Sequence, residues 1–393
     1  MEKQIVKIPD VLFFQEGPGV RNTQYTTSGV KLLNVANLVD GKLDLSTSDR
    51  YISESEAYGK YKHFLCDLGD FIVASSGIKV DYIDRKMGFV EESMLPLCMN
   101  TSTIRFKVLN PEILKIRYFM YFLKSHLFKE QLAHHITGSA QLNYGPSHLK
   151  KMTMPIVPIE LQDKIIKKLD KIQKIISARQ KELRIFDDLI KARFVEMFGD
   201  INLNDKNWDS EPLGELCTIV RGGSPRPIEQ FLGGDVPWIK IGDATEGDNV
   251  YLNSTKEHII QEGVKKSRLV KSGSLIFANC GVSLGFARII TFDGCIHDGW
   301  LALEDIDNRL DKVFLLQALN QMTEHFREIA PSGTQPNLNT TIMKAYKQIL
   351  PPVDIQREYI EFVKQIDKSK VVVQKALDEA QLLFDSLMQQ YFG

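Results

Sequence analysis

The chain has 393 residues, of which 43% are hydrophobic and 25% charged, and this composition predicts a globular protein that is too long for a single core. Lys and Arg number 49 and Asp and Glu number 50, so the net charge of −1 excludes the strongly basic surface of a non-specific DNA binder. The charge is uneven, because residues 1–200 carry 29 basic and 24 acidic side chains and residues 201–393 carry 20 and 26. Any nucleic-acid contact must therefore be local, or another subunit must neutralise much of the phosphate charge.

Neither a membrane span nor a secretory signal is predicted, because no apolar run approaches ~18 residues and the N-terminal segment lacks a signal-peptide pattern. The five cysteines show neither C-x-x-C spacing nor even pairing. We therefore expect reduced thiols in a cytoplasmic protein.

Residues 1–154 are predicted to form a mixed domain of strands and helices. Turn residues separate short apolar runs, and one longer segment has helical spacing of its aromatic and aliphatic residues. In chain order we expect a strand at 31–35, a turn at 40–41, a buried strand at 71–74 ended by Ser75-Ser76-Gly77, a helix at 116–131, a polar loop at 137–144 and a strand-like exit at 154–158.

A long helix is predicted next, because apolar or long residues recur at alternating steps of four and three. This 3.5-residue repeat gives one narrow seam, which is typical of a coiled coil. A surface helix lying on its own globule is the alternative, although a globule-facing stripe is usually wider. The seam consists of Ile165, Leu169, Ile172, Ile176, Arg179, Leu183, Phe186, Ile190, Arg193 and Met197.

The whole arrangement then occurs a second time, which indicates a duplicated domain followed by a duplicated helix. Residues 273–281 match residues 69–77 at a displacement of 204, and the later landmarks match at a displacement of 194. The second copy has therefore lost ten residues in between. We expect a strand at 238–242, a buried strand within 273–281, a helix at 313–326, a polar loop at 332–337 and a second seam from Tyr359 to Tyr391.

The two seams carry different polar interruptions. Lys370 in the second seam corresponds to Ile176 in the first, and Val373 corresponds to Arg179. Because buried polar positions set register and partner, this difference favours two helices that pair with each other. Pairing between separate molecules is the alternative.

Motifs for an enzyme complete in one chain were not found. The sequence has no G-x-x-x-x-G-K-[ST] loop, no G-x-G-x-x-G after a strand and no H-E-x-x-H. It also lacks the Asp-Pro-Pro-Tyr or Asn-Pro-Pro-Phe tetrad that an amino-group methyltransferase places beside a flipped base. Pro9-Asp10 followed by Asp84-Arg85-Lys86 could be read as the carboxylate cluster of a nuclease, but such pairs arise by chance in a chain with 50 acidic residues.

The loops hold the side chains that could read DNA. Amides can bridge two positions of adenine, and arginine can make the bidentate guanine contact. Ser147 and Thr341, each three residues before a lysine, suggest short helix starts that could hold a phosphate. Ordinary turn residues are the alternative at any single position. The predicted DNA-contacting residues are Arg21, Ser75, Ser76, Lys79, Gln141, Asn143, Tyr144, Lys150, Arg221, Arg226, Asn279, Arg288, Thr334, Gln335, Asn337 and Lys344.

The duplicated order of residues 69–77, 138–143 and 155–162 before a long helix resembles the specificity subunit of type I restriction–modification systems. Residues 349–356, Ile-Leu-Pro-Pro-Val-Asp-Ile-Gln, are the closer match to that family's proline-proline to glutamine junction. Val157 stands where the family usually has the first of the two prolines. Trp208 and the Leu-Gly-Glu-Leu run after it are typical of the family, whereas the first half has only Val6 to Val11 at that place, so the sequence does not define where the first domain starts.

The resemblance implies an α+β fold with two tandem target recognition domains, each followed by a long helix, and the helices paired as an antiparallel coiled coil with pseudo-two-fold symmetry. It implies a non-catalytic subunit that reads a bipartite, asymmetric site in double-stranded DNA. Two methyltransferase subunits and the restriction–translocase subunits would be its partners, and S-adenosylmethionine, ATP and Mg would be bound by those partners rather than by this chain. The expected segments are 1–154, 155–200, 201–350 and 351–393.

An adaptor whose duplicated domains bind proteins or peptides is the alternative function. DNA binding that weakens steeply with salt, in the presence of a methyltransferase partner, would distinguish the two.

Overall fold

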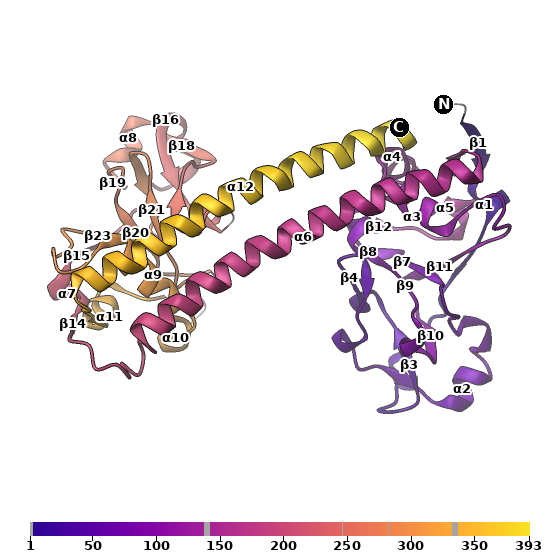
Figure 1. Ribbon diagram of the computed structural model, residues 1–393, viewed down its shortest axis with the longest axis horizontal. Coiled ribbons are helices and arrows are strands. Elements are labelled where there is room, and N and C mark those ends of the chain that lie inside the picture. Colours follow the sequence, from indigo (N-terminus) through magenta and orange to yellow (C-terminus); the bar gives the residue numbers. More distant parts are fainter. Residues whose placement is uncertain (1–2, 137–141, 246, 282, 332–336) are drawn as a thin grey trace. The chain divides into compact units, whose positions relative to one another are not determined.

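The computed structural model describes residues 3–136, 142–245, 247–281, 283–331 and 337–393. It forms two compact units, of which the first is made of two separate segments and the second of one continuous segment. Unit 1 comprises Met1–Gln180 and Lys375–Gly393, and unit 2 comprises Lys181–Gln374 (Figure 1).

The main sheet of unit 1 has four antiparallel strands in the order β2-β11-β7-β9. All four residues of the central strand β7 are apolar and buried, which confirms the buried strand predicted there. β2 and β9 form the two edges of the sheet, so the central strands β11 and β7 have a neighbouring strand on both sides. The strands are β2 (Leu12–Glu16), β11 (Thr103–Val108), β7 (Phe71–Ala74) and β9 (Met87–Phe89).

The helix predicted at 116–131 is in fact two helices, α3 (Ile116–Lys124) and α4 (His126–His135). Ser125 between them has extended backbone angles, and its hydroxyl donates to the Phe122 carbonyl at 2.6 Å and accepts from the Phe128 amide at 3.3 Å. This local bonding competes with helix continuation, and periodicity alone does not detect it. Unit 2 has the same division, into α9 (Lys312–Gln321) and α10 (Thr323–Ile329).

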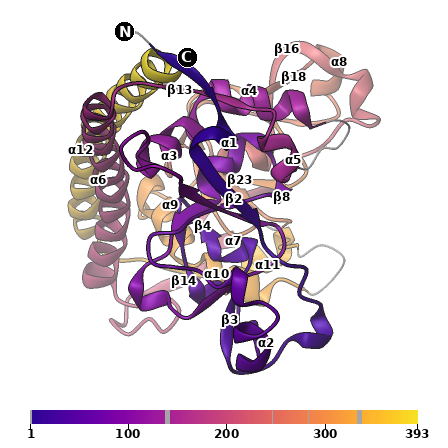
Figure 2. The same cartoon turned by 90° about the vertical axis from the view of Figure 1, so that its right-hand side faces the viewer.

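Helix α3 lies between the sheet of unit 1 and the ends of the long helices (Figure 2). Phe119 packs on the sheet, with its ring centroid 5.0 Å from that of Phe106. Tyr118, on the helix-facing side, contacts Phe392 at 5.0 Å between centroids. This arrangement buries both faces of α3 in one core.

The remaining elements of unit 1 are short and frame the main sheet. A second sheet, in the order β10-β3-β6, contains the predicted strand near residue 31. The strands are β1 (Gln4–Lys7), β3 (Val30–Leu33), β4 (Leu38–Val39), β5 (Lys42–Leu43), β6 (Tyr51–Ile52), β8 (Ser76–Ile78), β10 (Leu97–Met99), β12 (Leu142–Asn143) and β13 (Thr153–Ile156). The helices are α1 (Ile8–Val11), α2 (Glu54–Tyr58) and α5 (Pro146–Leu149), with 3-10 turns η1 (Asn22–Gln24), η2 (Val35–Asn37), η3 (Leu45–Thr47), η4 (Lys62–Phe64), η5 (Val80–Arg85) and η6 (Glu92–Met94).

Unit 2 contains a five-stranded sheet, β15-β23-β20-β21-β17, and a four-stranded sheet, β18-β16-β22-β19. The predicted buried strand is β20, whereas only Trp238 and Ile239 of the strand expected at 238–242 lie in β16, because the chain then turns into η8. The strands are β14 (Ser210–Pro212), β15 (Thr218–Arg221), β16 (Leu232–Ile239), β17 (Tyr251–Leu252), β18 (Glu257–Ile259), β19 (Arg268–Val270), β20 (Leu275–Ala278), β21 (Ala287–Ile290), β22 (Gly294–Ile296), β23 (Trp300–Glu304) and β24 (Lys347–Ile349). The helices are α7 (Leu213–Leu216), α8 (Gln261–Val264) and α11 (Thr340–Ala345), with turns η7 (Ile228–Gln230) and η8 (Ile241–Ala244).

The first strand of each unit pairs with the strand that precedes its long helix. β1 is antiparallel to β13, and β14 is antiparallel to β24 in the same way. A four-residue helix follows each first strand, α1 in unit 1 and α7 in unit 2. The structure thus aligns Val6 to Val11 with the segment around Leu213, although the two sequences differ.

The two predicted seams lie on α6 (Ile159–Phe198) and α12 (Val353–Phe392), each 40 residues long. In unit 1 the start of α6 packs against the end of α12, and in unit 2 the end of α6 packs against the start of α12. The pairing is therefore antiparallel in each unit, and every seam residue is buried or partly covered. The lysine in the second seam, Lys370, is neutralised by Asp187 at 2.6 Å.

A buried glutamine anchors the first turn of each long helix. Gln162 and Gln356, 194 residues apart, are both fully buried. Each side chain accepts one backbone hydrogen bond and donates two, at the same positions relative to its helix. Gln162 bonds to Lys115 N, Ile113 O and Val157 O, and Gln356 bonds to Asp311 N, Arg309 O and Pro351 O.

Candidate nucleic-acid interface

In unit 1 the end of the buried strand β7 meets the segment that follows the predicted polar loop. Ser76 pairs with Asn143 where β8 and β12 run antiparallel. The Tyr144 amide donates to the Ser75 carbonyl at 2.9 Å, and the Ser75 amide donates to the Ser102 carbonyl at 2.8 Å. The structure therefore brings together predicted residues that lie almost 70 positions apart in the sequence.

Unit 2 makes the same two hydrogen bonds at the end of β20. The Leu338 amide donates to the Asn279 carbonyl at 2.7 Å, and the Asn279 amide donates to the Gly299 carbonyl at 3.0 Å. Cys280 also forms a bridge with Asn337. We call this shared feature the strand edge of each unit.

A glycine completes each strand edge. The Gly17 amide donates to the Thr103 carbonyl and the Gly222 amide to the Trp300 carbonyl, both at 2.9 Å. A Cβ at Gly17 would lie 2.0 Å from the carbonyl oxygen of Asn100, and one at Gly222 would lie 2.2 Å from that of His297. Only glycine permits this close backbone approach.

The side chains at the strand edge of unit 1 are neutral amides and hydroxyls. Asn100 is buried, accepts from the Val20 amide at 3.3 Å and donates to Asn34 Oδ1 at 2.8 Å. It lines a hollow of about 340 Å³ together with Ser102, Thr47 and the exposed Arg50, among other residues. The guanidinium of Arg50 lies 5.3 Å from the ring centroid of Tyr25.

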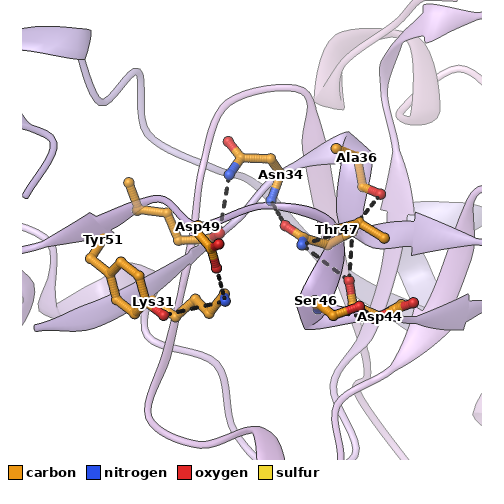
Figure 3. A network of polar contacts seen from close by, with 10 residues as sticks. Lys31, Asn34, Ala36, Asp44, Ser46, Thr47, Asp49 and Tyr51 are labelled. Atoms are coloured by element: carbon orange, nitrogen blue, oxygen red, sulfur yellow. Dashed lines mark hydrogen bonds and ion pairs between the residues drawn. The ribbon is translucent and has the colours of Figure 1, made fainter. Parts of the chain in front are cut away.

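A polar network supports one wall of this hollow (Figure 3). The Asn34 amide donates to Asn37 Oδ1 at 2.9 Å, and Asn37 Nδ2 donates to Thr47 Oγ1 at 3.2 Å. Beside it, Lys31 Nζ lies 3.2 Å from Asp49 and 3.4 Å from the Tyr51 hydroxyl. The wall is thus held by hydrogen bonds that leave Arg50 and Thr101 exposed at the rim.

Unit 2 places a carboxylate and arginines at its strand edge. Asp298 accepts from Ser224 Oγ at 2.8 Å and pairs with Arg226 at 3.3 Å and with His297 at 2.9 Å. Arg221 Nε donates to the Asp298 carbonyl at 3.0 Å. Asp298 therefore organises the two predicted arginines of this loop.

The electrostatics follow from this arrangement. Burial lowers the pKa of His297, which favours the neutral imidazole. Burial opposes ionisation of Asp298, but the Ser224 hydrogen bond and the nearby cationic groups together lower its pKa. Arg226 keeps an 80% exposed side chain, so its remaining donors face solvent.

Seven predicted residues in addition to Ser76 and Arg226 are exposed or half-buried. Arg221 and Asn337 lie at the strand edge of unit 2, and Asn143 at that of unit 1. Lys79 follows β8 and Lys150 ends α5, whereas Lys344 packs beside Gly214. Arg21 is exposed at the start of η1, where its backbone amide donates to Gln24 Oε1 at 3.1 Å.

Four other predicted side chains are covered by the protein. Ser75 is 1% exposed, Tyr144 2%, Asn279 0% and Arg288 7%. Asn279 Nδ2 donates to Asn337 Oδ1 and to the Leu338 carbonyl, both at 3.1 Å, so it fastens the loop rather than pointing outward. We leave these four out of the proposed base-contacting surface. Gln141, Thr334 and Gln335 lie outside the described residues.

The sequence did not single out Arg50, Ser224, His297 or Asp298. His297 and Asp298 directly precede β23, and only the pairing of β23 with β20 brings them beside Asn279. Their type and their position before an apolar strand were visible in the sequence, but the partner strand was not.

Two further features can be stated for the part of the chain that the structure describes. It contains no group of three His, Cys, Asp or Glu side chains that could hold a metal ion. None of its helices combines the length and apolar character that crossing a membrane requires.

The comparison with known proteins agrees with the duplicated architecture. The 393-residue chain is similar over 302 residues, at 22% identity, to the type I restriction enzyme StySPI specificity subunit of Salmonella potsdam, covering 72% of this chain and 65% of that protein. A 21% identical match to the MjaIX specificity subunit of Methanocaldococcus jannaschii spans 46% of this chain and 43% of that relative. The solved S subunit from M. genitalium shares the fold, with a TM-score of 0.54, 17% identity and coverage of 100% of this chain and 96% of that one.

The model of the type I restriction modification DNA specificity domain matches twice, at residues 4–185 and 205–380. These two matches cover most of the chain and correspond to its two copies of the domain and helix. The chain therefore belongs to the family of type I restriction–modification specificity subunits.

Proposed function

We propose that this chain reads a bipartite, asymmetric DNA site for a type I restriction–modification complex, one half-site with each recognition domain. The observation that carries this proposal is the pair of strand edges, which share their backbone hydrogen bonds but differ in their side chains. A common scaffold with different donors and acceptors is what two readers of different sequences require.

The side chains suit different base edges in the two units. Unit 1 offers Arg50 beside hydroxyl and amide groups, and unit 2 offers Arg221 and Arg226 around Asp298 together with the amide of Asn337 on the same strand edge. Arginine pairs bidentately with guanine and amides pair with adenine, each worth about 1–3 kcal/mol of discrimination. The exposed Lys79 and Lys150 would contact phosphates, which fix position rather than sequence.

Replacing a whole domain tests the modular reading. Exchanging residues 205–348 for the equivalent domain of a relative should change one half of the methylated motif and leave the other half intact. Methylated adenines mapped across a genome report the motif directly. A change in both halves contradicts independent reading.

Single substitutions sharpen the same test. Arg226→Gln should reduce the discrimination between bases at one position of the half-site read by unit 2. The expected reduction is roughly 5- to 150-fold, the range for one lost guanine contact. Arg50→Gln should do the same for the other half-site. Arg184→Gln, on the exposed face of α6, is the matched control and should change neither.

We also propose that catalysis belongs to the partners. In this proposal methyltransferase subunits bind S-adenosylmethionine, restriction–translocase subunits use ATP and Mg, and this chain positions them. Exposed apolar pairs on α12 lie outside the seam and suit docking of partner helices, namely Val371 and Val372 in unit 2 and Leu382 and Leu383 in unit 1. Stoichiometric S-adenosylmethionine binding to the isolated chain in a calorimeter would contradict this division of labour.

The helix pair is proposed to set the gap between the half-sites. A matched insertion of seven residues near Lys181 and near Lys375 keeps the 3.5-residue repeat. It lengthens each helix by about 10.5 Å, so the methylated motif should keep its halves and gain a gap longer by roughly three base pairs. An unchanged gap in an active variant would leave the helices as docking surfaces only.

The adaptor alternative predicts no salt-sensitive DNA binding. For the complex with methyltransferase subunits, we expect duplex affinity to fall linearly with salt on a logarithmic scale. Affinity for a duplex that stays constant across salt, or is absent in the assembled complex, would favour the adaptor.

A further inference from the structure

Unit 2 contains a cavity of about 240 Å³ that the strand-edge loops do not use. It lies among residues of α6, α9, α12 and β21 and is lined, among others, by Lys191, Arg288, Gln317 and Lys370. This volume is far above the roughly 10–15 Å³ that a single water needs, so the cavity can hold a small solute with bridging waters.

Arg288 is a buried cation in the wall of this cavity. The residue is only 7% exposed, and its guanidinium carbon lies 4.7 Å from the centroid of the Phe286 ring. Nη1 donates to the Ala287 carbonyl at 2.7 Å, and Nη2 reaches Asn249 Oδ1 only at 3.4 Å. Within the described part of the chain no carboxylate lies within ion-pair distance, and Nε has no hydrogen-bond partner.

Burial lowers the pKa of Arg288 to about 10, so the guanidinium remains charged near neutral pH. The charge of Asp248 partly opposes this lowering of the pKa, and that carboxylate accepts hydrogen bonds from the Val250 and Tyr251 amides. A charged group that has left water without an adjacent counter-ion is costly unless an anion joins it.

A second buried group lines the same cavity with unused hydrogen-bonding capacity. Gln317, in α9, is 7% exposed and makes no side-chain hydrogen bond with any described residue. Its amide atoms remain accessible from the cavity, so they can bond to a solute there.

The charged side chains that line the cavity are one aspartate and three cations. Asp187 is neutralised by Lys370 at 2.6 Å and also accepts from Asn249 Nδ2 at 3.4 Å. Lys191 is exposed at the rim and forms no ion pair with the described residues. Arg288 and Lys191 therefore remain as two cations of the lining that form no ion pair with a described residue, while Asp248 and Asp367 belong to the neighbouring hollow.

We propose that this cavity binds a phosphate group, held by Arg288 from within, by Lys191 at the rim and by the amide of Gln317. A phosphate offers several acceptor oxygens to donors that converge from different sides, which a planar carboxylate matches less well. The phosphate could belong to a small anion in solution or to the DNA backbone, and only the second case rests on the proposed function.

Binding of inorganic phosphate to the full-length chain tests the site. Calorimetry should show one site, and the thermal midpoint should rise by roughly 2–4 °C at about ten times the Kd relative to chloride of equal ionic strength. Phosphate also stabilises proteins non-specifically, so the informative quantity is the difference between variants.

Gln317→Glu should abolish this binding, because a carboxylate of nearly the same shape in the lining of the cavity repels the phosphate. Lys191→Gln, at an exposed position that folding does not depend on, should weaken binding several-fold. Lys181→Gln, exposed on the same helix and outside the cavity, is the matched control and should bind like the wild type. Absence of a phosphate site in the wild type, or an undiminished site in both cavity variants, overturns the proposal.

The source of the phosphate is read from salt dependence in the complex with methyltransferase subunits. If the DNA backbone occupies the cavity, Lys191→Gln should reduce the salt slope by about one, and free phosphate should compete with DNA. An unchanged slope with intact phosphate binding assigns the site to a small anion. Failure of the complex to bind DNA would contradict only the proposed function, because the calorimetric result stands without DNA.

Discussion

Unit 1 and unit 2 differ most where their backbones are most alike. Both strand edges are closed by matching backbone hydrogen bonds, yet Asn100 holds the loop of unit 1 as a neutral amide, whereas Asp298 holds that of unit 2 as a carboxylate among arginines. Backbone bonding therefore fixes where the loops lie, and the side chains are free to diverge in charge. A scaffold of this kind can change what it reads without changing how it folds.

The cores of the two sheets differ in the same manner. Arg105 in β11 and Asp70 form a buried ion pair at 3.1 Å, with side chains 7% and 3% exposed. The strand pairing shows that Ala302 is the residue of unit 2 equivalent to Arg105. The sequence displacement of 204 shows that Ser274 is the residue equivalent to Asp70. Unit 2 thus builds the same sheet without a buried charge pair.

The largest expected effect comes from breaking that ion pair. Asp70→Ala leaves Arg105 buried without its carboxylate and should destabilise unit 1 by about 3–5 kcal/mol. Hydrogen exchange of peptides from β7 and β11 measures the loss locally. The double change Asp70→Ser with Arg105→Ala, which copies unit 2, should cost less than the single change. An equal loss of protection against hydrogen exchange in peptides from unit 2 would contradict the local explanation.

The helix-anchoring glutamines should respond alike in both units. Gln162→Leu and Gln356→Leu each remove three hydrogen bonds and leave buried backbone groups unpaired, which should cost about 2–4 kcal/mol. Chemical unfolding monitored by exchange in each unit compares the two. A cost below about 1 kcal/mol in one unit only would show that the anchors are not equivalent.

The close glycines should be matched as well. Gly17→Ala and Gly222→Ala would each place a Cβ against a backbone carbonyl oxygen, at 2.0 and 2.2 Å, so we expect about 1–3 kcal/mol of destabilisation and weaker reading of one half-site each. Gly19→Ala and Gly242→Ala are controls, because a Cβ there meets nothing within 4 Å. If the controls cost as much, the close approach is not the cause.

The smallest expected effect is a pH dependence confined to unit 2. The pKa of His297 is lowered from 6.5 in the folded protein. As the pH falls, the unfolded state therefore takes up a proton before the folded state does. The stability of this strand edge is full above about pH 6.5 and decreases as the pH drops below that value. The lowered pKa of Asp298 adds a further loss below its ordinary value of 3.8. Once the intrinsic pH dependence is subtracted, amide hydrogen exchange of residues 297–304 should become faster as the pH is lowered from about 7.5 to about 5.5. The His297→Gln variant should not show this acceleration.

At the corresponding place in unit 1, residues 100–102 contain no titratable side chain, so exchange of residues 100–108 is the internal reference once the intrinsic pH dependence is subtracted. The same acceleration in both segments would mean that His297 is not responsible.

The sequence by itself determined the duplication, the two buried strands and the long helices. These features are encoded locally, because the steps from Ile165 to Met197 and the apolar run at Phe71 express a backbone period that needs no distant partner. The seam of α12 was predicted for the same reason, whereas only the structure identified Asp187 as the partner of its lysine.

Tertiary structure alone decided which predicted residues meet, because a hydrogen bond between distant strands leaves no periodic trace in either of them. It placed Ser75 beside Tyr144 and Asn279 beside Leu338, and it put His297 and Asp298 at an edge where the sequence showed only a short polar step. It also decided burial: Arg288 was predicted to lie in a loop, but it lies in β21 and is buried. Exposure depends on packing between elements, so composition and spacing could nominate a side chain but could not show which way it faces.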